Sequence, residues 1–132
     1  MEFTVETDAR LTTVDVTDRV AEAIPADLDS GIATAFVKHT TAGLVIQENE
    51  PRLRSDLERY LSEVVSDEGH AHDELDGNAD SHLRAMLLGP SVSIPIEDGE
   101  LALGTWQSIL FVECDGPRTR RLSVTVSRGG LP

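Results

Sequence analysis

The strongest constraint on the fold is an apolar run that lacks a polar face. Residues 107–114 read "QSILFVEC", and apolar residues occupy odd and even positions alike through the middle of this run. Successive side chains of a β-strand point to opposite faces of the sheet, so a strand with one wet face alternates apolar and polar residues. This run therefore predicts a central strand that is covered on both faces.

Several further strands can supply part of the covering layers. Alternating or β-branched segments predict strands over residues 3–7, 11–17, 31–38, 42–48, 91–96 and 122–127. We expect the strands at 31–38 and 42–48 to be joined by a tight or bulged connection at "HTT". Because strands and helices do not alternate regularly along the chain, the sequence favours an α+β fold over a parallel α/β fold.

Two clear helices follow from apolar residues at helical spacing. One is predicted over residues 49–66, with charged residues on its other face, and one over residues 79–88, where Asn78 can cap the start. The inward stripe of the second helix is expected to be Leu83, Met86 and Leu87. With a short helix near the start of the chain, these elements predict β-sandwich-like, mixed or antiparallel sheets with about three helices.

The length of 132 residues suits a single compact domain, and we take residues 1–132 as one unit. Cys114 is the only cysteine, so no disulfide can form within the chain, as is usual in a reducing compartment. The apolar run is far too short to span a bilayer, and no basic region followed by an apolar one opens the sequence. We expect a cytoplasmic protein without membrane contacts.

Acidic residues are spread along the whole chain, which has a net charge of -13 and a single lysine, Lys38. Such a surface repels phosphate backbones, so nucleic acid is not an expected partner. A dense carboxylate surface keeps proteins soluble in concentrated salt, and the salt screens its self-repulsion. The composition therefore predicts a protein from a salt-loving cell.

The histidines are the first candidates for metal ligands. His72 and His82 flank a loop too polar to lie in the core, and His39 ends a strand. Three histidines with an open fourth position make a catalytic metal site, since neutral imidazole is a common ligand. The spacing alone favours the alternative, a solvated loop for His70 and His72 and a hydrogen-bonded strand end for His39.

Other polar residues have both a structural and a functional interpretation. Glu48 and Asn49 can complement the helix dipole and cap the long helix, or serve a site. Asp76 is a turn residue or the partner of a metal-bound histidine. Arg118 and Arg120 pair with surface carboxylates or form a fork for phosphate. Trp106 is expected to pack in the core, supporting a site without reacting in it.

Four segments of the chain resemble the YjbQ-like family, which is named for a secondary thiamine-phosphate synthase activity. The strongest match is "SVSIPIEDGELALGTWQSI", where "GTWQ" stands at the expected distance from the aliphatic strand. "HTTAGLVIQENE" and "HDELDGNADSHLRAMLLGPS" resemble the family's histidine segments, and "DGPRTRR" resembles its closing turn. The segments lie in the family's order and cover most of residues 38–121.

The resemblance implies a fold, an assembly and a site. It implies a compact α+β fold, a homotrimer with sites near the subunit interfaces, and a divalent metal, zinc or, for the transferase reaction, magnesium. His39, His72 and His82 fall on the motif histidines and would hold the metal. The implied substrate is a small phosphorylated molecule contacted by Thr40, Arg118 and Arg120. The implied catalytic or orienting groups are Glu48, Asn49, Asp76, Gln107 and Glu113.

The family name implies a weak coupling of a thiazole phosphate to a pyrimidine diphosphate, with release of pyrophosphate. A cation that neutralises the leaving pyrophosphate and donors that orient it would serve this reaction. Two other functions stay open at this point. One is a metal-dependent hydrolase that uses a bound hydroxide, and the other is a non-enzymatic trimer that binds a small anion or a metal.

The acidic composition makes a prediction about salt. We expect the free energy of unfolding to be larger in molar KCl than in dilute buffer, because salt screens the repulsion among the carboxylates. Urea denaturation at both salt concentrations measures the difference. Equal stability in the two buffers would contradict the interpretation of the charge as an adaptation to salt.

Overall fold

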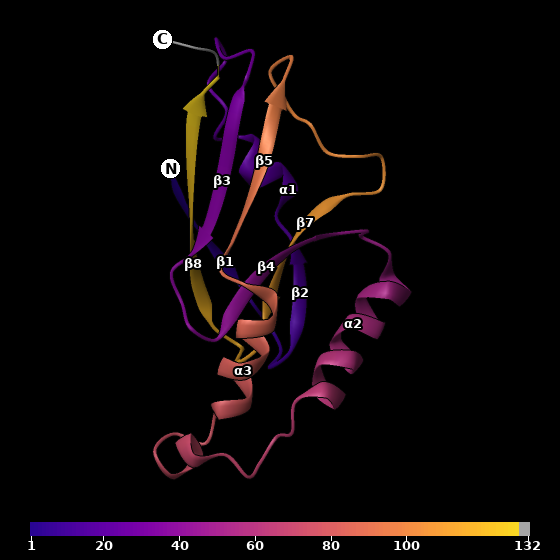
Figure 1. Cartoon of the computed structure of the whole chain (residues 1–132), viewed down its shortest axis with the longest axis vertical. Coiled ribbons are helices and arrows are strands. Elements are labelled where there is room, and N and C mark those ends of the chain that lie inside the picture. The colour runs from indigo at the N-terminus through magenta and orange to yellow at the C-terminus, as the bar shows by residue number, and fades with distance from the viewer. Residues whose placement is uncertain (130–132) are drawn as a thin grey trace.

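The computed structural model describes residues 1–129, which form two antiparallel sheets and three α-helices (Figure 1). The larger sheet has the order β1 (Glu2–Glu6), β8 (Thr119–Arg128), β3 (Gly31–Val37), β5 (Ser91–Glu97) and β6 (Glu100–Leu101). The smaller has the order β2 (Thr12–Asp15), β7 (Ser108–Glu113) and β4 (Ala42–Gln47). The helices are α1 (Thr17–Ala21), α2 (Pro51–Val64) and α3 (Ala79–Leu88), with a 3₁₀ turn, η1 (Ala71–Glu74). The α+β class and the antiparallel sheets are as predicted.

The predicted central strand is confirmed as β7, which lies between β2 and β4. Ile109 and Phe111 point into the main core, which fills the space between the two sheets. Val112 and Cys114 point to the other side and form a second cluster with Leu61 of α2. Both faces of the strand are therefore buried, as its unbroken apolar run requires. No helix within residues 1–129 is long and apolar enough to cross a bilayer.

The strands on either side of "HTT" form as predicted, but they belong to different sheets. β3 pairs with β5 and β8, whereas β4 pairs with β7. Residues 38–41 therefore carry the chain from one sheet to the other and do not make a hairpin. The crossing runs against the end of α3, because Val37 donates its N–H to the carbonyl of Pro90 and Leu44 donates to that of Gly89.

Gly43 permits this close approach between β4 and the end of α3. A Cβ at position 43 would lie 2.7 Å from the carbonyl oxygen of Gly89 and 2.8 Å from Cβ of Leu88. Any larger residue would push the helix away from the sheet. The crossing that carries His39 and the helix that carries His82 are thus held together by backbone contacts.

The buried face of α3 differs from the expected apolar stripe. Met86 and Leu87 are 73% and 61% exposed, whereas Asp80, Ser81 and Arg84 are buried. The prediction failed because it assigned apolar residues to the interior by default. Arg84 is instead buried by a set of partners that satisfies its guanidinium.

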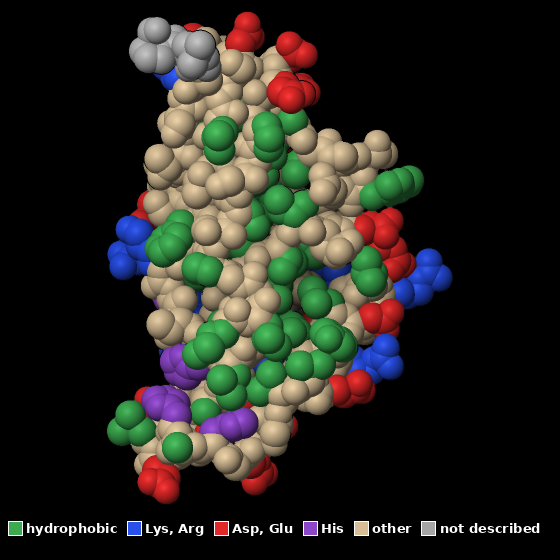
Figure 2. Space-filling view, in the orientation of Figure 1, with side chains coloured by type: hydrophobic (Ala, Val, Ile, Leu, Met, Phe, Trp, Pro, Cys, Tyr) green, Lys and Arg blue, Asp and Glu red, His purple; other side chains and the backbone are tan. Residues whose placement is uncertain are grey.

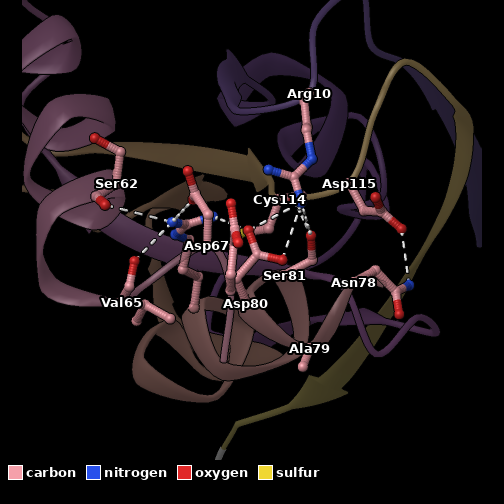
Figure 3. Close-up of polar contacts among 12 residues, drawn as sticks. Arg10, Ser62, Val65, Asp67, Asn78, Ala79, Asp80, Ser81, Cys114 and Asp115 are labelled. Atoms are coloured by element: carbon pink, nitrogen blue, oxygen red, sulfur yellow. Dashed lines mark hydrogen bonds and ion pairs between the residues drawn. The ribbon is translucent and has the colours of Figure 1, made fainter. Parts of the chain in front are cut away.

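Arg84 ties α3 to the end of α2. Figure 3 shows the polar network around this contact, with Val65, Asp67 and Asp80 labelled. Arg84 donates to the carbonyls of Leu61 and Val65 at 2.8 Å each, and these belong to the helix end, where carbonyls lack partners within the helix. It also pairs with Asp80 and with Asp67. On the other side, Ser81 donates to the carbonyl of Cys114. Residue 82 follows directly, so this network fixes where His82 lies.

Arg84→Met should destabilise the protein by about 3 kcal/mol or more, because it leaves Asp80 with a weaker set of partners in a buried position. The exposed pair of Arg59 and Asp56 supplies the control. Arg59→Met should change the free energy of unfolding by less than about 1 kcal/mol. Urea denaturation in molar KCl measures both, and equal effects would show that the Arg84 network contributes nothing beyond a surface pair.

Candidate functional site

His39 and His82 meet where the crossing between the sheets reaches the start of α3, and the ring of His72 lies beside that of His82. An open pocket of about 690 Å³ lies there, bounded also by the turn between β7 and β8. Among its lining residues are His39, Thr40, Asp76, Asn78, His82, Asp115, Arg118 and Arg120. Figure 2 shows the histidine side chains gathered at this lower end of the molecule. Segments far apart in the sequence therefore contribute to one surface.

His39 lies directly after β3, and its ring accepts a hydrogen bond. Its Nε2 is 2.8 Å from the backbone N of Arg121, which can only donate. In the neutral ring the proton therefore lies on Nδ1. Partial burial lowers the pKa of His39, and the nearby guanidinium groups of Arg120 and Arg121 lower it further. His39 is accordingly neutral at pH 7.

His72 has the opposite tautomer, fixed by Asn78. Nε2 of His72 lies 3.1 Å from Oδ1 of Asn78, and Nδ2 of Asn78 donates to the carboxylate of Asp115 at 3.1 Å. Because the carboxylate can only accept, the amide oxygen must face His72, and Nε2 must carry the proton. Asp76 lies 3.7 Å from the same nitrogen, too far for a hydrogen bond.

Arg118 holds Asp115 in place. Its Nε donates to the carbonyl of Asp115 at 2.7 Å and its Nη2 to the carboxylate at 3.0 Å. The backbone N–H of Arg118 donates to Oγ1 of Thr7, which anchors the turn to the end of β1. The side chain of Arg118 is about half exposed on the wall of the pocket. It therefore organises the turn while its guanidinium stays open to a ligand.

Arg120, at the floor of the pocket, forms a buried ion pair with Glu113. Arg120 is 4% exposed and Glu113 is fully buried. The guanidinium donates to both carboxylate oxygens and to Oγ1 of Thr41, and Thr7 and the N–H of Asp115 also donate to the carboxylate. Burial alone would raise the pKa of Glu113, but these hydrogen bonds outweigh it and hold the pKa below its usual value. Glu113 is an ionised anchor for Arg120.

Three of the predicted site residues lie elsewhere in the chain. Glu48 and Asn49 precede α2, and Asn49 bonds Asp15 and Arg54. Gln107 is exposed, and its side chain accepts from the N–H of Gly104. These residues follow β4 or precede β7, whereas the pocket lies at the other ends of both strands. Within one chain the structure does not bring them to the histidines.

Trp106 does not pack in the core, contrary to prediction. It is 73% exposed in the loop before β7, which begins at Ser108 and not at residue 107. The turn closed by Gly104 and Gln107 ends the loop and turns the indole outward. A lone tryptophan beside an apolar run resembles core in sequence, and only the turn geometry distinguishes the two.

Sequence reasoning missed two residues at the site, Asn78 and Asp115. Asn78 is at the N-cap position of α3 as predicted, but its side chain makes no capping bond. It is used for His72 and Asp115 instead. Because a capping role accounts for an asparagine at this position, no pattern in the sequence pointed to the second role.

The three histidines are not equally suited to a metal. Within residues 1–129 no three His, Cys, Asp or Glu side chains are arranged to hold a metal ion. The rings of His72 and His82 have centroids 5.0 Å apart and planes at 89°, which is an edge-to-face contact. Two imidazoles on one tetrahedral zinc, with bonds of about 2.0–2.1 Å, have centroids roughly 5 Å apart. His72 also donates its other ring N–H to a polar partner, as metal-bound histidines do, whereas His39 accepts.

These features define a small two-sheet α+β protein with a pocket lined by histidine and arginine at one end of the sandwich. The chain belongs to the UPF0047 YjbQ-like family, whose model matches residues 1–129. This finding agrees with the resemblance seen in the sequence.

Relatives and solved structures resemble the whole chain. It is 47% identical to a UPF0047 protein of Archaeoglobus fulgidus over 125 residues, 94% of this chain and 98% of the relative. The crystal structure of hypothetical protein APE1520 from Aeropyrum pernix K1 is 40% identical, with a TM-score of 0.93 and 98% of each chain covered. A protein of unknown function from Sulfolobus solfataricus P2 is 35% identical, with a TM-score of 0.92 over 96% of this chain and 94% of that one. Their names state no activity.

Glu113→Gln should lower the free energy of unfolding at pH 7 by about 3 kcal/mol, because Arg120 then lacks its buried counter-charge. The lowered pKa of Glu113 means that its carboxylate stabilises the fold above the unfolded value of about 4.3. That contribution is lost as the pH falls through the folded value. The difference between wild type and variant should therefore shrink in acid.

Urea denaturation from pH 7 down to pH 3 measures this difference. Glu97→Gln serves as the control, since Glu97 is an exposed carboxylate at the end of β5. A difference between wild type and Glu113→Gln that stays constant with pH would show that the pair is not ionic.

Proposed function

We propose that the pocket binds the phosphoryl groups of a small phosphorylated molecule and that the protein is a transferase of the thiamine-phosphate synthase type. In this reaction a thiazole phosphate displaces pyrophosphate from a pyrimidine diphosphate. The observation that carries the proposal is the cationic lining of the pocket. Arg118 and Arg120 line it and Arg121 adjoins it in a chain of net charge -13, where anions are repelled almost everywhere else.

The pocket supplies what the departing pyrophosphate needs. Negative charge grows on the leaving group as its bond breaks, so preorganised donors lower the barrier. Arg120 is held rigidly by Glu113 and Thr41, so it does not have to reorganise during the reaction. Arg118 lies beside it on the wall and offers a planar fork suited to phosphate oxygens. Thr40, exposed on the crossing, offers a hydroxyl donor at the rim.

A divalent metal is part of the proposal, with His72 and His82 as its protein ligands. Zinc fits imidazole ligands, and magnesium is the alternative for a diphosphate substrate. When bound, the ion would add positive charge next to the phosphoryl groups. Asn78 fixes the tautomer of His72 and leaves its Nδ1 free of a proton. Asp76 lies 3.7 Å from Nε2 of His72 and places a carboxylate beside the same ring.

The proposal includes a homotrimer, because one chain does not collect all the expected residues. β4 and β7 pair from Ala42–Glu113 at the pocket to Gln47–Ser108 at the far end, a separation of roughly 17 Å. A head-to-tail contact between copies would bring the far end of one chain to the pocket of the next. Phe36 and Met86 are exposed near the pocket, and Figure 2 shows apolar side chains in this region of the surface.

The metal is tested by mass spectrometry of untagged protein purified in molar KCl without chelators. We expect near-stoichiometric metal in the wild type and its loss in the double variant His72→Ala/His82→Ala. His70→Ala is the control, since the ring of His70 contacts the carbonyl of Ser66 and does not line the pocket of His39 and His82, so the metal content should stay unchanged. A wild type that stays free of metal after reloading would contradict the metal site.

The reaction is tested on the same samples with thiazole phosphate and pyrimidine diphosphate. Thiamine phosphate and pyrophosphate formed in equal amounts would support the transferase. Pyrophosphate alone would identify a hydrolase, and binding without turnover across a panel of phosphorylated molecules would identify a binding protein. Sedimentation equilibrium measures the assembly, and a monomer at micromolar concentration would contradict the trimer.

A further inference from the structure

We infer that His39 is a hydrogen-bond donor to the bound anion, through Nδ1–H, and is not a metal ligand. The backbone amide of Arg121 fixes this role. The inference rests on the proposed function, because it assigns one of the three motif histidines to the phosphoryl groups and leaves the metal to the other two.

The first argument comes from the two ring nitrogens of His39. A neutral imidazole has one N–H and one lone pair. Nε2 uses the lone pair to accept from Arg121 at 2.8 Å, so Nδ1 holds the proton. Binding a metal at Nδ1 would require a second lone pair and hence an imidazolate. Binding one at Nε2 would require the Arg121 amide to lose its partner.

The second argument is that the Arg121 amide cannot turn away. Arg121 lies within β8, opposite Thr4 of β1. The pairing of β3 with β8 ends at Val37 and Leu122, so Arg121, the neighbour of Leu122, has no partner residue in β3. The chain leaves the sheet at this point, so no carbonyl of β3 accepts from the N–H of Arg121. The ring of His39 accepts this hydrogen bond instead. The ring is therefore held by the sheet itself, whose hydrogen bonds are costly to break.

The third argument is the charge around the ring. The charges of Arg118, Arg120 and Arg121 all act on His39, and that of Glu113 opposes them. Glu113 is already paired with Arg120. A second cation on His39 would add to this positive charge, whereas an N–H donor beside the arginines complements a phosphoryl oxygen. His72 has the reverse arrangement, since its N–H is used by Asn78.

NMR of ¹⁵N-labelled protein in molar KCl tests the tautomers directly. Long-range ¹H–¹⁵N correlations separate protonated from unprotonated ring nitrogens. We expect His39 with the proton on Nδ1 and His72 with the proton on Nε2. Zinc should shift the unprotonated nitrogen of His72 and leave the nitrogens of His39 in place, whereas pyrophosphate should shift the Nδ1–H signal of His39. A zinc-induced shift at a His39 nitrogen of the size seen at His72 would overturn the inference.

Two substitutions of His39 test the roles of Nδ1 and Nε2 one at a time. The amide of an asparagine lies near the position of Nδ1, so His39→Asn keeps a donor there. The longer side chain of His39→Gln reaches the position of Nε2 and can still accept from Arg121, but it lacks the donor at Nδ1. We expect both variants to keep wild-type zinc content. Pyrophosphate binding should weaken by about tenfold or more in His39→Gln and by clearly less in His39→Asn.

The outcomes distinguish this inference from the proposed function. Loss of zinc in folded His39→Asn and His39→Gln, with zinc present in the wild type, would overturn the inference and leave the proposed function standing. Wild-type pyrophosphate affinity in His39→Gln would do the same. A wild type that binds no pyrophosphate would overturn the proposed function and the inference with it. Urea denaturation establishes that each variant is folded, and His70→Gln controls for substitution of a histidine that does not line the pocket of His39.

Discussion

The buried ion pair between Glu113 and Arg120 lies where the end of β7, the start of β8, the crossing at Thr41 and the end of β1 at Thr7 meet. A buried pair gains little net stability over apolar residues, but removing one partner is costly. Here the pair fixes the positions of several segments relative to one another, because each partner also forms a hydrogen bond to another segment. The pair fixes the floor of the pocket and the turn that carries Asp115, and through Asp115 and Asn78 it reaches His72.

A second polar network fixes the position of α3, which carries His82 to the pocket. α3 turns Asp80, Ser81 and Arg84 inward and leaves Met86 and Leu87 exposed. An apolar face would let a helix slide or rotate against its neighbours at little cost in free energy. The hydrogen bonds from Arg84 to the carbonyls of Leu61 and Val65, at the end of α2, permit only one position. The helix therefore presents His82 at a fixed place beside the ring of His72. Stability and site geometry depend on the same side chains.

The predictable part of the fold was the part governed by burial and periodicity. The run at residues 107–114 required a strand covered on both faces, and the helix at 79–88 has the bounds that its spacing predicted. Interactions that depend on specific partners escaped prediction. Nothing in the pattern around "HTT" distinguishes a hairpin from a crossing between sheets, and nothing in the sequence marks Arg84 as a buried residue until its partners are known. Asn78 was assigned to a helix cap because that role was sufficient.

The histidine motifs illustrate the same limit at the level of chemistry. The sequence motifs do not distinguish the roles of His39, His72 and His82, since the residue type is the same in each case. What separates them is the neighbour of one ring nitrogen: a backbone donor for His39 and an amide acceptor for His72. A donor neighbour turns the free nitrogen into an N–H, and an acceptor neighbour turns it into a lone pair. The two rings therefore differ at their free nitrogens, which carry an N–H in His39 and a lone pair in His72.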